Sequence, residues 1–312
     1  MQIAYVFPGQ GSQSLGMLGA LAQRFPEVEQ TFAQASEVLE LDLWKLACEG
    51  PVEAINRTEN TQPLMLAAGV AVARVWAAQG GAPAAMMAGH SLGEYSALVC
   101  AGSLDYAQAV RMVAERARLM QNAVPEGEGA MAAIIGLDDD AVQAACKSVA
   151  DAGVVEAVNF NAPGQVVIAG EKVAVEAAMQ AAKAAGAKRA LPLPVSVPSH
   201  CRLMNNASQQ LHQKLEGISV QTPKVPVLHN VDVASHEEPV IIRSALAAQV
   251  KQPVRWVETI QAMSAQGITR IIEMGPGKVL TGLNKRIDSS LELHCVSDPE
   301  SLEAAMQLGR AA

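Results

Sequence analysis

The sequence is poor in aromatic side chains, has no long hydrophobic run and carries no excess of positive charge. Phe, Trp and Tyr make up 3% of the 312 residues, although 50% are hydrophobic and alanine dominates. Packing through small side chains favours a helix-rich α/β protein, and this length can form one large core with a smaller unit beside it. The formal net charge of −8 argues against a nucleic-acid-binding protein, which normally carries a basic surface.

Paired cysteines and targeting segments are missing as well. The five cysteines are widely spaced, with no C-x-x-C pair: Cys48, Cys100, Cys146, Cys201 and Cys295. We therefore expect neither a disulfide framework nor a zinc site, and interpret these thiols as small buried hydrophobic groups. The first residues lack a basic segment followed by a hydrophobic signal core, and no run approaches ~18 apolar residues. We expect a cytoplasmic protein that does not enter a membrane.

The most informative stretch is the G-x-S-x-G motif at Gly89–Gly93, with Ser91 at its centre. Residues 84–88 are apolar, as in a buried parallel strand, and residues 92–101 carry apolar side chains at helical spacing. A serine on such a strand-to-helix turn has an exposed hydroxyl and lies at a helix N-terminus, which favours developing negative charge. This context predicts a serine nucleophile for acyl transfer.

Strands and helices alternate around this motif, which predicts a parallel sheet covered on both faces. The expected strands of this large domain are residues 2–7, 84–88 and 271–274, and the expected helices are 15–24, 29–40, 60–79, 92–101, 105–122, 204–216 and 241–251.

A segment with a different order interrupts this alternation. The pattern predicts strands at 130–136, 154–160, 166–170 and 187–195, and helices at 138–151 and 172–185. The order βαββαβ is that of a ferredoxin-like module. We therefore expect an inserted ferredoxin-like domain at 126–197, within a large domain formed by 1–125 and 198–312.

A serine nucleophile needs a base, usually a histidine. The chain has six: His90, His200, His212, His229, His236 and His294. His200 follows the inserted module, where the chain re-enters the large domain, and is our preferred base. His294 lies near the chain end and follows Glu292, so a serine hydrolase in the order Ser, acid, His stays open. Cys201 beside His200 offers a Cys–His pair in a poorer context.

Several motifs together resemble the malonyl-CoA:acyl carrier protein transacylases, and most closely the stand-alone bacterial enzymes of type II fatty acid synthesis. They run in order over nearly the whole chain: Phe7–Gln13 (FPGQGSQ), Gly89–Tyr95 (GHSLGEY), Asn159–Gln165 (NFNAPGQ), Pro198–His200 (PSH), Gln249 before Pro253–Trp256 (PVRW), and Glu273–Gly277 (EMGPG). The implied fold is an α/β-hydrolase-like domain with a parallel sheet and the smaller ferredoxin-like insertion.

The resemblance implies a role for each matching residue. Ser91 is the nucleophile and His200 its general base, without a triad carboxylate, and the main-chain carbonyl of Gln249 orients the histidine. The backbone N–H groups of Gln10 and Leu92 form the oxyanion hole. Loss of one such donor typically costs about 10²–10³ in rate.

Two further residues are implied to contact the substrate. Arg116, in the sequence AERARLM, holds the free malonyl carboxylate by two hydrogen bonds. From the pattern alone, Glu115, Arg116 and Arg118 are equally a solvated helix face. Asn159 is expected near the cleft, although the Asn-Ala-Pro-Gly turn beside it is also ordinary hairpin chemistry.

The implied activity is a ping-pong transfer from malonyl-CoA to the phosphopantetheine thiol of acyl carrier protein, with no metal or redox cofactor. The expected partners are malonyl-CoA and acyl carrier protein, and the expected state is a monomer. A thioesterase or esterase that uses water, and a non-catalytic binding protein, are the alternatives. An acidic carrier protein would need a local basic patch, for which the candidates are Lys188, Arg189, Lys278, Lys285 and Arg286.

Overall fold

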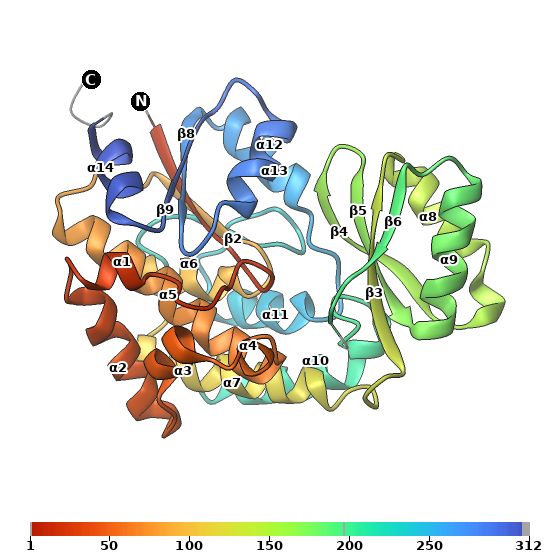
Figure 1. The fold of residues 1–312 in the computed structure, drawn as a ribbon, viewed down its shortest axis with the longest axis horizontal. Coiled ribbons are helices and arrows are strands. Elements are labelled where there is room, and N and C mark those ends of the chain that lie inside the picture. The colour runs from red at the N-terminus through yellow and green to blue at the C-terminus, as the bar shows by residue number, and fades with distance from the viewer. Residues whose placement is uncertain (1, 196, 308–312) are drawn as a thin grey trace.

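The computed structural model describes residues 2–195 and 197–307, which form a mixed α/β structure with two separate sheets (Figure 1). The larger sheet is parallel, in the order β7-β2-β1-β8-β9. The smaller one is antiparallel, in the order β4-β5-β3-β6. The strands are β1 (Gln2–Phe7), β2 (Met86–Gly89), β3 (Gly129–Ile135), β4 (Val155–Ala162), β5 (Gln165–Glu171), β6 (Arg189–Pro192), β7 (Val227–Leu228), β8 (Ile268–Met274) and β9 (Glu292–Val296).

Successive side chains of a strand point to opposite faces of the sheet, and both faces of the parallel sheet are buried. Along β1, Tyr5 and Phe7 pack into the larger core, whereas Ala4 and Val6 pack into a second one. The helices outside the antiparallel unit are α1 (Gly19–Ala22), α2 (Glu27–Leu39), α3 (Leu43–Glu49), α4 (Val52–Ile55), α5 (Thr58–Ala78), α6 (Gly93–Cys100), α7 (Tyr106–Gln121), α10 (Asn205–Glu216), α11 (Pro239–Gln249), α12 (Trp256–Ala265), α13 (Val279–Ile287) and α14 (Pro299–Gln307).

The antiparallel sheet forms a lobe of its own, drawn in green in Figure 1. Helices α8 (Asp139–Lys147) and α9 (Lys172–Ala184) cover one face, and Ile134 and Val166 pack against them. On the other face, Met131 and Val167 pack with Cys201, which belongs to the chain just after the lobe. This second face therefore joins the small lobe to the segment that carries His200.

The ends of the two central strands lie side by side. Phe7 of β1 pairs with Gly89 of β2 in the parallel register. The chain leaves β1 through Pro8–Gly11 and leaves β2 through His90–Leu92, so both loops lie at the carboxyl edge of the sheet, where open α/β sheets bind ligands.

Several expected boundaries differ from the structure. The helix expected at 15–24 is wrong over 15–18, because α1 begins only at Gly19, after Leu18 takes a left-handed φ of 62°. The helix expected at 138–151 ends at Lys147, and a short 3₁₀ turn covers Ala150–Ala152. The sequence pattern did not predict seven further elements: α3, α4, β7, α12, α13, β9 and α14. Most of these are short, and their periodicity is too brief to identify.

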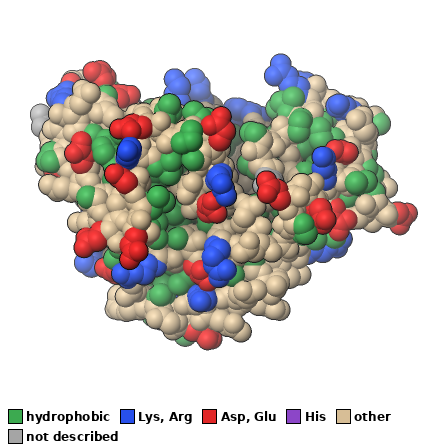
Figure 2. Space-filling model, turned by 60° about the horizontal axis from the view of Figure 1, so that its bottom comes forward, with side chains coloured by type: hydrophobic (Ala, Val, Ile, Leu, Met, Phe, Trp, Pro, Cys, Tyr) green, Lys and Arg blue, Asp and Glu red, His purple; other side chains and the backbone are tan. Residues whose placement is uncertain are grey.

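The surface carries both signs of charge. On the face drawn in Figure 2, acidic and basic side chains are interspersed. No helix among the described residues is both long and apolar enough to span a bilayer.

Candidate active site

Ser91 occupies the sharp turn between β2 and α6, and the glycines around it allow very close backbone approach. A Cβ at Gly93 would lie 2.1 Å from the Phe7 carbonyl oxygen, so only glycine fits where α6 passes the end of β1. Ser91 has a φ of 51°, in the left-handed region that non-glycine residues rarely adopt. Such strain persists only where the surrounding structure over-determines it, and it is concentrated at functional sites.

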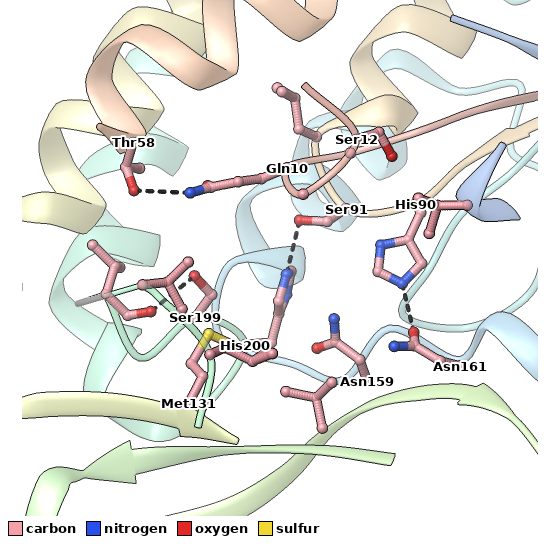
Figure 3. Close-up of a pocket in the computed structure, with 18 of the residues that line it drawn as sticks. Gln10, Ser12, Thr58, His90, Ser91, Met131, Asn159, Asn161, Ser199 and His200 are labelled. Carbon is pink, nitrogen blue, oxygen red and sulfur yellow. Dashed lines mark hydrogen bonds between the residues drawn. The ribbon is translucent and has the colours of Figure 1, made fainter. Parts of the chain in front are cut away.

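The Ser91 hydroxyl contacts the imidazole of His200, as Figure 3 shows. Ser91 Oγ lies 2.8 Å from His200 Nε2, and His200 Nδ1 lies 2.7 Å from the main-chain oxygen of Gln249. Because a carbonyl only accepts, Nδ1 carries the proton and donates to it. Nε2 is then left as the acceptor for the Ser91 hydroxyl proton, which is the arrangement a general base needs.

His200 is buried, with 3% of its surface exposed. Burial, with the positive charge of Arg116 as the next cause, lowers the pKa of His200 from 6.5 to about 3. An imidazole with a depressed pKa is a weaker base but stays unprotonated over a wide pH range.

Arg116 extends from α7 into the same site and is 1% exposed. Its Nη2 donates to Ser91 Oγ over 3.2 Å and to Gln249 Oε1 over 2.9 Å, and its Nη1 donates to Gln62 Oε1 over 2.6 Å. Its Nε is buried without a hydrogen-bond partner among the described residues. Burial lowers the pKa of Arg116. The hydrogen-bond acceptors of its guanidinium among the described residues are all uncharged, so the buried positive charge has no carboxylate paired with it there.

Arg118, two positions further on the same helix, lies in a different environment. Its side chain is exposed and donates to Glu115 over 2.7 Å and 2.9 Å. The structure therefore separates the two arginines, one in the cavity and one on the solvated face of α7.

A cavity of about 270 Å³ opens over this group. Gln10 and Leu92 line it, and neither backbone N–H has a hydrogen-bond acceptor within the described ranges. Gln10 also reaches Thr58 through its side chain, with Nε2 3.4 Å from Thr58 Oγ1 (Figure 3). Two unpaired N–H groups beside Ser91 can donate hydrogen bonds to an oxygen atom that becomes negatively charged during a reaction.

The small lobe contributes asparagines to the same cavity. Asn159 and Asn161 both line it, and Asn161 Oδ1 lies 2.8 Å from His90 Nε2. His90 thus points away from Ser91, as expected for the neighbouring position in the turn (Figure 3). Asn159 Oδ1 is buried without a partner among the residues that the structure describes.

The competing residues lie elsewhere or are inert. His294 contacts Glu292 over 3.0 Å on β9 and does not line the cavity. Cys201 is buried, its Sγ donates to the Pro198 oxygen over 3.1 Å, and burial raises the pKa of its thiol to about 12. No cluster of three metal-ligating side chains occurs in the part of the chain that the structure describes.

Four buried polar residues around the site were missed from the sequence: Gln62, Glu94, His229 and Asn230. Gln62 and Glu94 each stand within largely apolar helices, α5 and α6, which is the signal that could have singled them out. His229 and Asn230 directly follow β7, a two-residue strand too short to predict.

The geometry agrees with comparisons to known proteins. The acyl transferase domain family matches residues 4–298. The malonyl CoA-acyl carrier protein transacylase of Escherichia coli strain K12 is 57% identical over 307 residues, which is 98% of this chain and 99% of that protein. The chain belongs to the malonyl CoA-acyl carrier protein transacylase family.

A less similar relative and two solved structures support the same family assignment. The malonyl CoA-acyl carrier protein transacylase of Bacillus subtilis is 44% identical, covering 98% of this chain and 96% of that one. An acyl carrier protein S-malonyltransferase crystal structure from Vibrio cholerae is 57% identical with a TM-score of 0.95, covering 97% and 99% of the two chains. A malonyl-transacylase in complex with its type II PKS acyl-carrier protein is 57% identical with a TM-score of 0.98, covering 99% and 100%.

Proposed function

We propose that this protein transfers the malonyl group from malonyl-CoA to the phosphopantetheine thiol of acyl carrier protein, through a malonyl ester on Ser91. The product supplies extender units for fatty acid synthesis. The observation that carries the proposal is the Ser91–His200 contact of 2.8 Å, with the guanidinium of Arg116 a further 3.2 Å from the same hydroxyl oxygen.

In the first half-reaction, Ser91 Oγ attacks the thioester carbon while His200 Nε2 takes the hydroxyl proton. The oxyanion that forms accepts hydrogen bonds from the backbone N–H groups of Gln10 and Leu92. The carbon–sulfur bond then breaks, His200 returns the proton to sulfur, and CoA leaves as the thiol. The Gln249 carbonyl keeps the imidazole in the required tautomer, which the 2.7 Å contact supports.

In the second half-reaction, His200 takes the proton of the phosphopantetheine thiol. The thiolate attacks the ester carbon, and Ser91 recovers its proton from His200 as the ester bond breaks. Both steps move an acyl group without net oxidation, so the proposed mechanism needs no redox cofactor, and its charge stabilisation is assigned to backbone N–H groups in place of a metal. Placing the ester in a cavity between two lobes favours a bound thiol over bulk water as the acceptor.

Selection of malonate over acetate falls to Arg116. In the free protein its guanidinium is held by Gln62 and Gln249, while Nε lacks a partner among the described residues. A malonyl carboxylate supplies a charge partner for this buried guanidinium, whereas an acetyl group does not. Asn159, with its buried Oδ1, is proposed to contact the substrate chain beyond the thioester.

We also propose the finer description of the fold. The strand–helix order of the small lobe and its sheet order β4-β5-β3-β6 support a ferredoxin-like insertion at 126–197. The serine turn at the carboxyl edge of the parallel sheet supports a hydrolase-like large domain. The monomeric state and the cytoplasmic location expected from the sequence stay predictions.

The deciding experiment is the mass of the intact protein after brief mixing with malonyl-CoA, with acetyl-CoA and Ser91→Ala as controls. We expect a malonyl adduct on the wild type alone, which added holo acyl carrier protein discharges. Fast release of CoA without an adduct would instead support a hydrolase, and no reaction at all would support a binding protein.

A further inference from the structure

Glu94 is a carboxylate buried directly beneath the Ser91 turn. It lies in the first turn of α6, is 0% exposed, and its backbone N–H donates to Ser91 O over 3.0 Å. Burying a carboxylate costs several kcal/mol unless donors surround it. The proposed reaction steps give Glu94 no task, so its burial at this position calls for another explanation.

Three donors from two other segments converge on Glu94. His229 Nδ1 lies 2.7 Å from Oε1, while the Asn230 backbone N–H and Gln249 Nε2 donate to Oε2 over 2.9 Å and 2.8 Å. Asn230 in turn accepts from the Ser91 backbone N–H over 2.7 Å and donates to Gly89 O over 2.7 Å. Hydrogen bonds through Asn230 thus connect the strained turn at Ser91 to Glu94.

The carboxylate also decides which way the Gln249 amide faces. A carboxylate oxygen with two donors accepts only, so it binds the NH₂ end of the amide, which also donates to Ser91 O over 3.0 Å. The amide oxygen is then left pointing at Arg116 Nη2, 2.9 Å away. The reversed amide would set its NH₂ against the guanidinium and its oxygen against the carboxylate, two repulsive contacts.

Arg116 has few other constraints. Gln62 holds Nη1 through one oxygen, and among the described residues the Nε2 of Gln62 has the sulfur of Met120 as its sole hydrogen-bond acceptor, 3.7 Å away. The Gln249 oxygen is therefore the second fixed point of the guanidinium. We propose that Glu94 is a positioning residue for substrate selection, because it orients the Gln249 side chain that holds Arg116 beside Ser91.

This inference rests on the proposed malonyl transfer and assigns Gln249 two separable tasks. Its main-chain oxygen serves His200, and its side chain serves Arg116. A substitution of the side chain alone leaves the main-chain contact in place, so the two tasks can be measured apart.

The test compares malonyl and acetyl loading of Ser91 by rapid-quench mass spectrometry for Glu94→Met, Glu94→Gln and Gln249→Met. Glu94→Met removes the acceptors at nearly constant volume, and we expect the malonyl-over-acetyl ratio of kcat/KM to fall by about 10- to 100-fold, the equivalent of one hydrogen bond to a charged group. Glu94→Gln keeps one oxygen for Gln249 and should restore most of the ratio. Gln249→Met should reproduce the loss of Glu94→Met.

Glu273→Met is the matched control, because Glu273 is also 0% exposed but binds Leu280 and Thr281 at the start of α13. It should lower the melting temperature while the ratio changes less than about threefold. An unchanged ratio in Glu94→Met, an equal loss of both rates, or a Glu94→Gln variant that behaves like Glu94→Met would overturn the inference. If Glu94→Met does not fold, a wild-type ratio in Gln249→Met overturns it equally. Failure of the wild type to load malonate would instead refute the proposed function.

Discussion

Arg116 donates a hydrogen bond to the hydroxyl oxygen of Ser91 across 3.2 Å, although the two residues come from different elements, α7 and the turn after β2. An acyl group bound to Ser91 therefore forms within reach of a buried guanidinium. We therefore expect recognition of the acyl group and the chemistry on it to occur in one place.

Arg116→Ala should impair malonyl loading far more than acetyl loading. Truncating one partner of a buried charge pair typically costs about 2–5 kcal/mol, so kcat/KM for malonyl-CoA should fall by about 10²–10³-fold. Arg118→Ala is the matched control on the same helix, because that side chain is exposed and pairs with Glu115 at the surface. Arg118→Ala should change the rate of malonyl loading by less than about twofold in a stopped-flow or rapid-quench assay. If Arg116→Ala slows loading from malonyl-CoA and from acetyl-CoA equally, its selective role is refuted.

Loading should resist mild acid. Because burial lowers the pKa of His200 to about 3, the imidazole stays neutral and able to accept a proton well below its ordinary value of 6.5. We therefore expect kcat/KM for malonyl-CoA to show no loss with an apparent pKa near 6.5, and to fall only nearer pH 3–4. If kcat/KM falls with an apparent pKa near 6.5 while the protein remains folded, the pKa of His200 is not lowered by burial and this prediction is wrong.

The same shift predicts a stability effect. Between pH 6.5 and about 3 the unfolded chain binds a proton at His200 that the folded protein does not. Stability from this group therefore falls as pH decreases through that window. The melting temperature of His200→Ala should fall less between pH 7 and pH 5 than that of the wild type, as differential scanning calorimetry can measure.

Two Gly→Ala substitutions should have opposite effects. At Gly93 the new methyl would lie 2.1 Å from the Phe7 carbonyl oxygen, so the Ser91 turn must move, and we expect a loss of about 1–3 kcal/mol or more together with most of the loading rate. Gly282, inside α13, has nothing within 4 Å of a new Cβ. Gly282→Ala should stabilise the protein by about 0.5–1 kcal/mol and keep its activity, because alanine favours a helix. Urea titration distinguishes the two signs.

Docking of the carrier protein should depend on the lysines at the two ends of α13. Val279, Leu280 and Leu283 line the cavity, and the exposed Lys278 and Lys285 lie at the N-cap and in the last turn of that helix. Replacing both lysines by glutamate should raise the apparent KM for acyl carrier protein about 3- to 10-fold and leave malonyl-CoA loading unchanged. Lys147→Glu, at the exposed end of α8, serves as the control, and an unaltered KM in the double variant would refute docking there.

Much of this arrangement is predictable from local pattern. The apolar run before Gly89 and the helical spacing after it placed Ser91 between a strand and a helix, where β2 and α6 lie. The alternation of strands and helices also predicted a parallel sheet and a second unit of different order, and the structure has both sheets. The elements that were missed are mostly short, such as α4 and β7, because four or two residues carry no measurable periodicity.

The sequence by itself therefore determined the α/β class, the serine turn and, through its ordered motifs, the family. Local pattern alone left open which histidine meets Ser91 and which arginine of α7 enters the cavity; the family resemblance implied His200 and Arg116, and the tertiary structure brings both to Ser91. What lies beneath the turn was decided by the tertiary structure alone. Arg116 and Arg118 are equivalent charges in a local pattern, but two residues along a helix are a rotation of about 200°, which turns one inward and one to solvent. Along the chain, Asn230 lies 136 residues from Glu94, and Gln249 lies 155 residues from it. Only folding makes the three residues neighbours.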